Sequence, residues 1–177
     1  MSKAIYMFDD IIKDLTTVLN VRDRTSIPKQ DLLFYPVYEK ALAQSEVLID
    51  YCGAEISADF ENAPSVNYNK AYLESIFSNL LTNAIKYRSN KRKLKVTIKT
   101  EESGNFIVLK FSDNGLGIDL ELHKEKMFRL YQRFHEHAEG KGLGLFLIKS
   151  QLEALNGSID IESKLDEGTT FILKFRR

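Results

Sequence analysis

Two periods of apolar residues along the chain predict a mixture of strands and helices. Alternation of apolar and polar side chains, with period two, is typical of strands that are buried on one side. Strands are expected on this basis at residues 31–35, 56–60, 94–100, 106–112, 158–164 and 169–176. The last four would form two antiparallel pairs, joined by short turns at residues 101–105 and 166–168.

Helical spacing of apolar residues, three and four positions apart, predicts four helices. They are expected at residues 4–22, 36–52, 70–88 and 145–156. Gly53 would end the second helix, residues 64–67 would form a loop, and Asn67 or Asn69 would cap the third. The expected buried face of the second helix consists of Val37, Ala41, Val47, Leu48 and Tyr51.

The resulting order of elements indicates an α+β fold, with a mixed sheet and helices packed on one face. Residues 4–22 carry the seam of a helical hairpin or coiled coil, which favours an oligomerising helix; a helix docked on its own domain is the alternative.

Composition limits the classes of protein to consider. The chain has 177 residues and equal numbers of basic and acidic residues, 25 each, so no overall positive charge indicates nucleic-acid binding. Cys52 is the single cysteine, which excludes a disulfide within the chain and fits a reducing compartment. Since no apolar run approaches the ~20 residues of a membrane helix, we expect a cytoplasmic protein or fragment without a membrane segment.

A polar stripe on the third helix is the first candidate site. Asn79, Asn83, Lys86 and Tyr87 follow one another at helical spacing, beside an apolar stripe that can pack on a sheet. Two amides, an ammonium and a phenol suit a ligand with a metal ion, phosphates and a flat ring. A solvated helix surface is the alternative interpretation.

Two glycine-containing segments are further candidates. Asp113 ends a predicted strand and is followed by Gly115 and Gly117, which let a ligand approach the backbone closely; an ordinary turn is the alternative. Residues 140–144 contain three glycines directly before a helix, where free backbone amides can bind phosphate. This segment matches neither a Walker loop nor a dinucleotide-binding fingerprint.

Five sequence blocks, in the right order, closely resemble the catalytic ATP-binding domain of sensor histidine kinases. The blocks are NLLTNAIKY, DNGLGI, MFRLYQRF, GKGLGL and EGTTF, and the resemblance covers residues 30–177. It implies the two-layer α/β sandwich of the ATPase superfamily that also contains DNA gyrase and the ninety-kilodalton heat-shock chaperone, which is called the Bergerat fold. The nucleotide would lie between the long helix and a lid at residues 128–142.

The resemblance implies ATP and Mg²⁺ as cofactors and assigns roles to individual residues. Asn83 would bind Mg²⁺, Asp113 would accept a hydrogen bond from the adenine amino group, and Arg133 would stabilise charge on the transferred phosphoryl group. Asn79 would act beside Asn83 in catalysis. The remaining nucleotide contacts would come from Lys86, Tyr87, Gly115, Gly117, Ile118, Gly140, Lys141, Gly142, Leu143, Gly144 and Thr169.

Two departures from the family pattern bear on function. No histidine precedes His123, so the phosphoacceptor histidine of the dimerisation hairpin is absent, and residues 1–25 resemble only the second helix of that hairpin. Residues 26–177 would then be the catalytic domain of a fragment. The segment between Arg133 and Gly140 is also short, so the lid would order differently from longer ones.

The resemblance predicts a histidine kinase that transfers phosphate to a histidine supplied by its dimerisation domain, for relay to a response regulator. The full-length protein would be a homodimer. Related hydrolases carry a glutamate at the position of Asn79; since an amide cannot take a proton from water, we expect slow hydrolysis. The alternatives are a nucleotide-binding signalling module without catalysis, acting through its N-terminal helix, and a protein-serine kinase that restrains a transcription factor.

Overall fold

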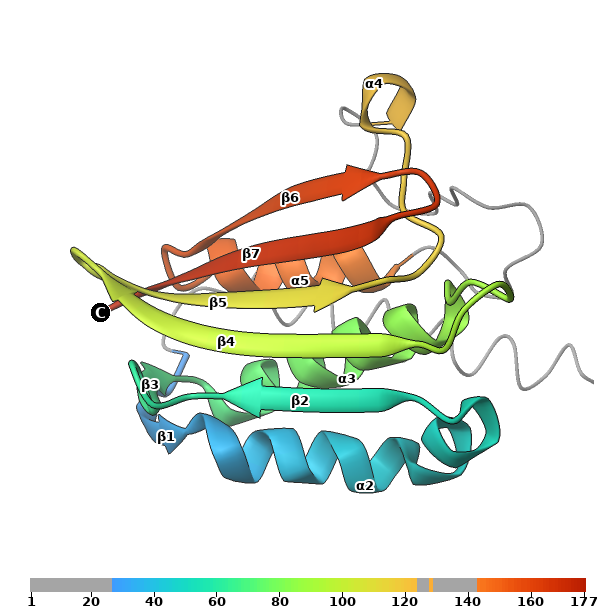
Figure 1. The fold of residues 1–177 in the computed structure, drawn as a ribbon. Coiled ribbons are helices and arrows are strands. Elements are labelled where there is room, and N and C mark those ends of the chain that lie inside the picture. The colour runs from blue at the N-terminus through green and yellow to red at the C-terminus, as the bar shows by residue number, and fades with distance from the viewer. Residues whose placement is uncertain (1–26, 124–127, 129–142) are drawn as a thin grey trace, which may run out of the picture.

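A five-stranded mixed sheet forms one layer of the molecule in the computed structural model, which describes residues 27–123, 128 and 143–177 (Figure 1). Its strands lie in the order β2-β4-β5-β7-β6. They span Glu55–Asp59 (β2), Lys95–Ser103 (β4), Phe106–Asp113 (β5), Ser158–Lys164 (β6) and Gly168–Arg176 (β7). β2 pairs in parallel with β4, and the other three pairs in this sheet are antiparallel.

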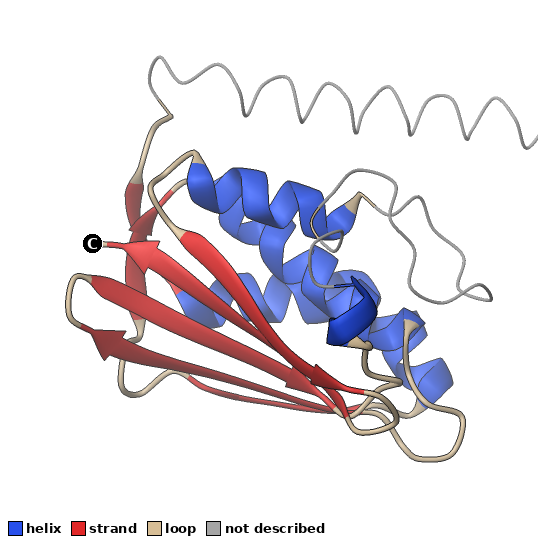
Figure 2. Cartoon of the chain, turned by 90° about the horizontal axis from the view of Figure 1, so that it is seen from above, coloured by secondary structure: helices blue, strands red, loops and turns tan. Residues whose placement is uncertain are grey.

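Helices form the second layer, on one face of this sheet (Figure 2). They are α2 (Phe34–Cys52), α3 (Lys70–Lys86) and α5 (Gly144–Glu153), with a single turn, α4 (Leu120–His123), set apart from them. A separate antiparallel pair joins β1 (Gln30–Leu33) to β3 (Ser65–Tyr68). The predicted fold class, a mixed sheet with helices on one face, is therefore confirmed for the part of the chain described here. The expected helix at residues 4–22 lies outside it.

The core lies between the two layers, where the apolar stripe of α3 faces the sheet. The apolar stripe expected on this helix is buried, and its residues are Leu73, Ile76, Phe77, Leu80, Leu81, Ala84 and Ile85. Phe34 stacks on Phe60 with ring centroids 5.6 Å apart and meets Phe175 edge-on at 6.1 Å. Each of these buried aromatic side chains contributes about 1.5–3 kcal/mol of hydrophobic stabilisation, which holds α2 and α3 at a set distance from the sheet.

The helix boundaries follow from local chemistry. The side chain of Asn69 accepts a hydrogen bond from the backbone amide of Tyr72 at 3.1 Å, which confirms it as the cap of α3. Gly53 ends α2 in the left-handed conformation, with φ of 61°, as predicted.

Two local predictions were wrong. The buried face of α2 is formed by Phe34, Val37, Ala41 and Ser45. Val47 and Tyr51 are more than four-fifths exposed, and Leu48 is about half exposed. Residues 65–68, expected within or next to a loop, instead form β3, because β1 supplies their backbone hydrogen-bond partners from more than 30 residues away.

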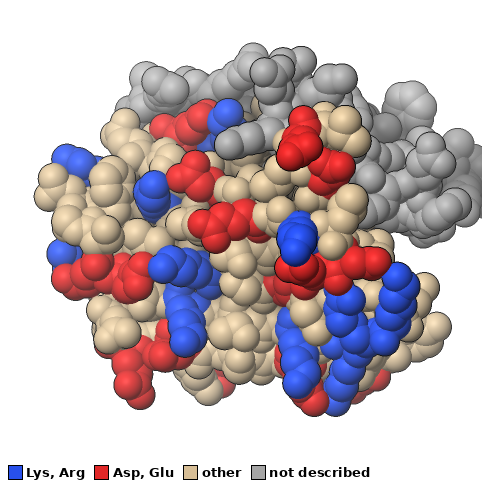
Figure 3. All heavy atoms as spheres, turned by 45° about the horizontal axis from the view of Figure 1, so that its top comes forward, with Lys and Arg blue, Asp and Glu red and all other residues tan. Residues whose placement is uncertain are grey.

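The outer face of the sheet is covered by charged side chains of both signs (Figure 3). Ion pairs join neighbouring strands across this face, including Lys95 with Glu55, Lys110 with Glu101 and Lys174 with Asp160. None of the helices in the described part of the chain has the length and apolar composition needed to cross a bilayer.

Candidate functional site

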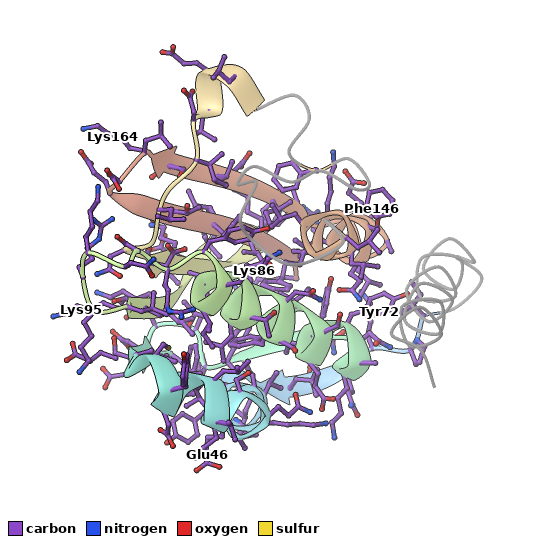
Figure 4. The ribbon with its side chains drawn as sticks, turned by 90° about the vertical axis from the view of Figure 1, so that its right-hand side faces the viewer. Glu46, Tyr72, Lys86, Lys95, Phe146 and Lys164 are labelled. Atoms are coloured by element: carbon purple, nitrogen blue, oxygen red, sulfur yellow. The ribbon has the colours of Figure 1, made fainter. Side chains whose placement is uncertain are left out.

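Four segments that are distant in sequence meet at one end of the molecule. The end of α3, the start of α5, the end of β5 and the start of β7 all lie at this end, which Figure 4 views directly, with Lys86 near its centre. In the sheet, Asp113 is the direct partner of Thr169. Between the helices, a Cβ atom placed on Gly144 would lie 3.0 Å from Oδ1 of Asn79 and 3.5 Å from Nδ2 of Asn83. The fold therefore brings together most of the residues that the sequence suggested.

The amide of Asn79 has a defined orientation. Its Nδ2 donates to the backbone oxygen of Ser75 at 2.8 Å and to Oγ of Ser75 at 3.3 Å. Gln151 of α5 donates from Nε2 to the same Oγ at 3.0 Å. Because the amide nitrogen is held by α3 itself, the oxygen of Asn79 is directed toward Gly144 at the start of α5. The site therefore presents an oxygen ligand beside the first helical turn after the glycine segment.

Lys86 and Tyr87 form a unit at the end of α3. Nζ of Lys86 donates to the hydroxyl of Tyr87 at 2.9 Å and lies 4.5 Å from the centroid of its ring. This arrangement combines a hydrogen bond with a cation–π contact, which together stabilise a charged group that is only partly exposed. A cation and an aromatic ring are thus placed side by side, within one turn of Asn83.

Asp113 is a partly buried carboxylate at the end of β5. It continues the inward-facing series of Leu109 and Phe111, so its side chain lies on the helix side of the sheet. Burial raises the pKa of Asp113 to about 6; amide hydrogen bonds from Gly115 and Thr169, and the charge of Arg92, oppose that rise. The Gly115 bond to Oδ1 is 2.8 Å long. A carboxylate offers more acceptor positions than these two amides use, so Asp113 can accept a further hydrogen bond from a ligand.

The glycines of this end are needed because backbone segments approach one another closely. A Cβ atom on Gly115 would lie 2.6 Å from the backbone oxygen of Tyr87. Gly117 and Gly168 have φ of 67° and 130°, and a Cβ atom on either would overlap a backbone oxygen, that of Lys164 or of Asp113. The glycine pattern therefore reflects the close packing of three loops around Asp113.

Thr169 is buried beside Asp113 and belongs to a hydroxyl network. Oγ of Ser163 donates to the backbone oxygen of Gly168 at 2.9 Å and accepts from the amide of Ile118 at 2.8 Å. Oγ of Ser163 also lies 2.9 Å from Oγ1 of Thr169. Since the single proton of Ser163 is donated to Gly168, Thr169 supplies the proton of this contact, and its own oxygen remains an acceptor.

Some predicted site residues cannot be placed, and other residues were not predicted. Leu143 is buried directly before α5. Arg133, Gly140, Lys141 and Gly142 lie outside the described residues, as does all of the proposed lid except residue 128. Arg92, Ser75 and Ser163 were missed, because Arg92 stands in a basic run that is typical of a solvated loop and a lone serine carries no signal in a sequence.

Comparison with known proteins decides the family. The model described as "Histidine kinase-, DNA gyrase B-, and HSP90-like ATPase" matches residues 68–177. The chain belongs to this family. This confirms the resemblance found in the sequence, and the chain therefore carries an ATP-binding domain of the histidine kinase type.

The relatives are signalling proteins that are longer than this chain. Cyanobacterial phytochrome A of a Nostoc species is 36% identical over 171 residues, which cover 96% of this chain and 22% of the relative. Histidine protein kinase SaeS of Staphylococcus epidermidis is 28% identical over 97% of this chain and 49% of its own length. The chain thus spans between about a fifth and a half of the relatives that it matches.

Solved structures agree with the fold. Histidine kinase AdeS of Acinetobacter baumannii superposes with a TM-score of 0.77 at 22% identity, covering 97% of this chain and 79% of that one. Full-length ShkA in complex with AMPPNP gives a TM-score of 0.79 at 16% identity, covering 94% and 35%. At these identities the similarity establishes the architecture alone.

Proposed function

We propose that this chain is the catalytic ATP-binding domain of a two-component sensor histidine kinase, which transfers the γ-phosphoryl group of ATP to a histidine on a dimerisation domain. The observation that carries the proposal is the placement of a partly buried carboxylate, Asp113 at the end of β5, at the same end of the molecule as two amides, Asn79 and Asn83, beside the start of α5. The family match to residues 68–177 supports it.

Asp113 would recognise the adenine base. Its carboxylate accepts a hydrogen bond from the exocyclic amino group of adenine, whereas guanine carries a carbonyl oxygen at that position and would repel it. Thr169, whose hydroxyl oxygen remains an acceptor, would support the base through a water molecule. Gly115, Gly117 and Ile118 would form the wall of the base pocket, and Tyr87 would flank the ribose or the ring.

The amide side chains of Asn79 and Asn83, whose Oδ1 and Nδ2 respectively lie nearest to Gly144, would contribute at most one or two oxygen ligands to a magnesium ion that is held mainly by phosphates. Amide oxygens are hard ligands, and Mg²⁺ in nucleotide sites keeps waters and phosphate oxygens as most of its coordination shell. No group of three or more His, Cys, Asp or Glu side chains in the described part of the chain could hold a metal alone, so Asn83 would contribute one ligand to a shared shell. When bound, the ion would neutralise charge on the phosphates.

The remaining residues would position the phosphates. Lys86 would leave Tyr87 to contact them, and the amides of residues 140–144, with Lys141, would surround them at the start of α5. Arg133 would approach the γ-phosphoryl group. Residues 128–142 would act as a lid that closes over this part of the nucleotide.

Kinase chemistry is favoured over hydrolysis by the chemistry of Asn79. Its amide nitrogen is committed to Ser75, and its oxygen has no basicity at neutral pH, so this residue cannot activate a water molecule. Residues 26–177 would therefore position ATP, while the acceptor histidine and its acid–base partner come from the dimerisation domain, of which residues 1–25 would be the last part. We further propose that the full-length protein is a homodimer, either cytoplasmic or anchored to a membrane with this domain in the cytoplasm, and that it passes phosphate to a response regulator.

Calorimetric titration with ADP and AMPPNP, with and without Mg²⁺, tests the binding function, with GTP as the control. Adenine-selective, magnesium-dependent binding is the expected result, and the absence of binding by a folded protein would overturn the proposal. Addition of a histidine-bearing hairpin in trans should then yield acid-labile protein phosphate with ATP. Binding without transfer to such hairpins would instead support a nucleotide-binding signalling module.

A further inference from the structure

The segment between α3 and β4 holds the loop that follows Asp113. Arg92, in this segment, donates from Nε to the backbone oxygen of Asn114 and from Nη2 to that of Gly115, each at 2.6 Å. The guanidinium group is partly buried, and its two nitrogens grip two consecutive carbonyl groups. Such a fork requires the planar, rigid donor geometry of arginine.

The same carbonyl groups determine where the adjacent amides point. In a trans peptide unit the C=O and N–H groups project to opposite sides, and the described residues contain no cis peptide bond. The carbonyl of Asn114 belongs to the same unit as the N–H of Gly115, which donates to Oδ1 of Asp113 at 2.8 Å. The carbonyl of Gly115 belongs to the same unit as the N–H of Leu116, which donates to the backbone oxygen of Tyr87 at 2.9 Å.

We propose that Arg92 is a positioning residue for adenine recognition: by holding the carbonyls of Asn114 and Gly115, it turns the Gly115 amide toward Asp113 and sets the orientation of that carboxylate. This role rests on the proposed nucleotide-binding function. The Arg92 side chain thereby orients two peptide planes. One of these planes contacts Asp113, which is assigned to the adenine base, and the other contacts Tyr87, which is assigned to the ribose or the side of the ring.

Other contacts hold the outer parts of this loop, whereas Arg92 binds the carbonyl groups of the two peptide units that flank the Gly115 Cα atom. The side chain of Asn114 accepts from the amide of Lys95 at 2.8 Å and donates to the backbone oxygen of Lys93 at 3.0 Å. On the far side, the amide of Asp166 donates to the backbone oxygen of Leu116 at 2.7 Å. The charge of Arg92 adds to its geometric effect, since it favours the ionised form of Asp113 that accepts a hydrogen bond.

Three variants of the full chain separate this role from a general effect on folding. Arg92→Gln removes the fork and the charge, whereas Arg92→Lys keeps the charge but cannot bridge both carbonyls. Lys93→Gln is the matched control, because the neighbouring Lys93 pairs with Glu55 at 2.9 Å on the exposed surface. Affinities for ADP and GDP would be measured by calorimetry well below the unfolding temperature, and unfolding would be followed separately by calorimetric scanning.

We expect Arg92→Gln to lower the affinity for ADP roughly tenfold or more, a factor equal to about 1.4 kcal/mol, with little change in the affinity for GDP. The preference for ADP over GDP should therefore fall by the same factor. Arg92→Lys should lose selectivity severalfold, and Lys93→Gln should retain it. If the Arg92 variants unfold at lower temperature but keep wild-type selectivity, the role is structural and this proposal is overturned. Failure of the wild-type protein to bind ADP would instead overturn the proposed function and this role with it.

Discussion

Replacement of Asp113 by asparagine should stabilise the protein while weakening its binding of adenine nucleotides. Burial raises the pKa of this carboxyl from an ordinary value of 3.8 to about 6. The unfolded chain therefore releases this proton more readily than the folded one, and the ionised side chain destabilises the fold at neutral pH. Asparagine has nearly the same shape and no charge, so the substitution removes this effect.

The size of the effect follows from the pKa difference. A shift of about 2 pH units corresponds to ~3 kcal/mol at pH values above both pKa values. The variant loses part of this gain, because the amide bonds from Gly115 and Thr169 become bonds to a neutral acceptor. A net gain of about 1–2 kcal/mol remains, which for a chain of this length raises the unfolding temperature by roughly 2–8 °C.

The pH dependence has a definite sign. Between pH 4 and 6 the folded state retains the Asp113 proton while the unfolded state has lost it, so the contribution of this residue to stability falls as the pH rises through this range. The advantage of Asp113→Asn should therefore be largest above pH 6 and should shrink toward pH 4. Comparison with the wild-type protein at each pH removes the contributions of other carboxylates, such as Glu55 and Asp166, whose pKa values are lowered by lysine partners.

Scanning calorimetry of the nucleotide-free protein, at several pH values between 4 and 8, tests the stability effect. Asp50→Asn, on the exposed side of α2, is a suitable control for the loss of one negative charge. Titration with ADP at pH 7.5 should show a loss of roughly 1–3 kcal/mol in binding free energy for Asp113→Asn. An Asp113→Asn protein that is less stable than wild type at pH 7.5, or whose advantage does not depend on pH, would refute the reasoning.

Three further substitutions test the geometry of the site. Gly117→Ala should destabilise the fold by well over the ~1–2 kcal/mol that an alanine in the left-handed conformation costs, because its Cβ would overlap the backbone of Lys164. The control is Gly104→Ala, which has φ of 57° and open space around it and should cost only ~1–2 kcal/mol. Equal losses of stability for the two variants in chemical denaturation would contradict this. Asn83→Ala should remove most of the magnesium dependence of ATP binding, and an unchanged magnesium titration would exclude it as a ligand. Gly144→Ala should weaken ATP binding severalfold in calorimetry, because its Cβ would lie 3.0 Å from Oδ1 of Asn79 and 3.5 Å from Nδ2 of Asn83. Little stability should be lost, since these neighbours are side-chain and not backbone atoms, and wild-type affinity would show that this spacing does not matter for binding.

The main elements were predictable where local signals agreed with the global fold. The apolar stripe of α3 and the Asn69 cap agree on one helix, and the structure contains both. On α2 the signals conflict: Val37 and Ala41 lie on one side and Val47 and Tyr51 on another, and only contact with α3 decides which side is buried. The strand at residues 65–68 depends on β1, a distant partner that no local pattern reveals.

The residues of the candidate site also fall into those that the sequence revealed and those that only the folded structure revealed. Residues with a chemical signature, such as Asp113 before two glycines and the Asn79–Asn83 pair, were recognisable because the spacing of their side chains is local. Arg92 was not, because its partners are backbone carbonyl groups more than 20 residues away that only the folded chain brings near. The same holds for Ser163, whose role depends on the positions of Ile118 and Gly168.

The close packing of the loops around Asp113 has a consequence for how the protein acquires its ligand. The proposed base pocket would use residues 87–95, 113–118 and 163–169 together, so it would form only when the β6–β7 hairpin is paired with β5. Nucleotide would therefore bind only molecules in which β7 is paired with β5. Since a ligand that binds the native state alone adds about 2.7 kcal/mol of stability at a hundredfold excess over Kd, ATP would favour molecules with this hairpin in place over partly folded ones.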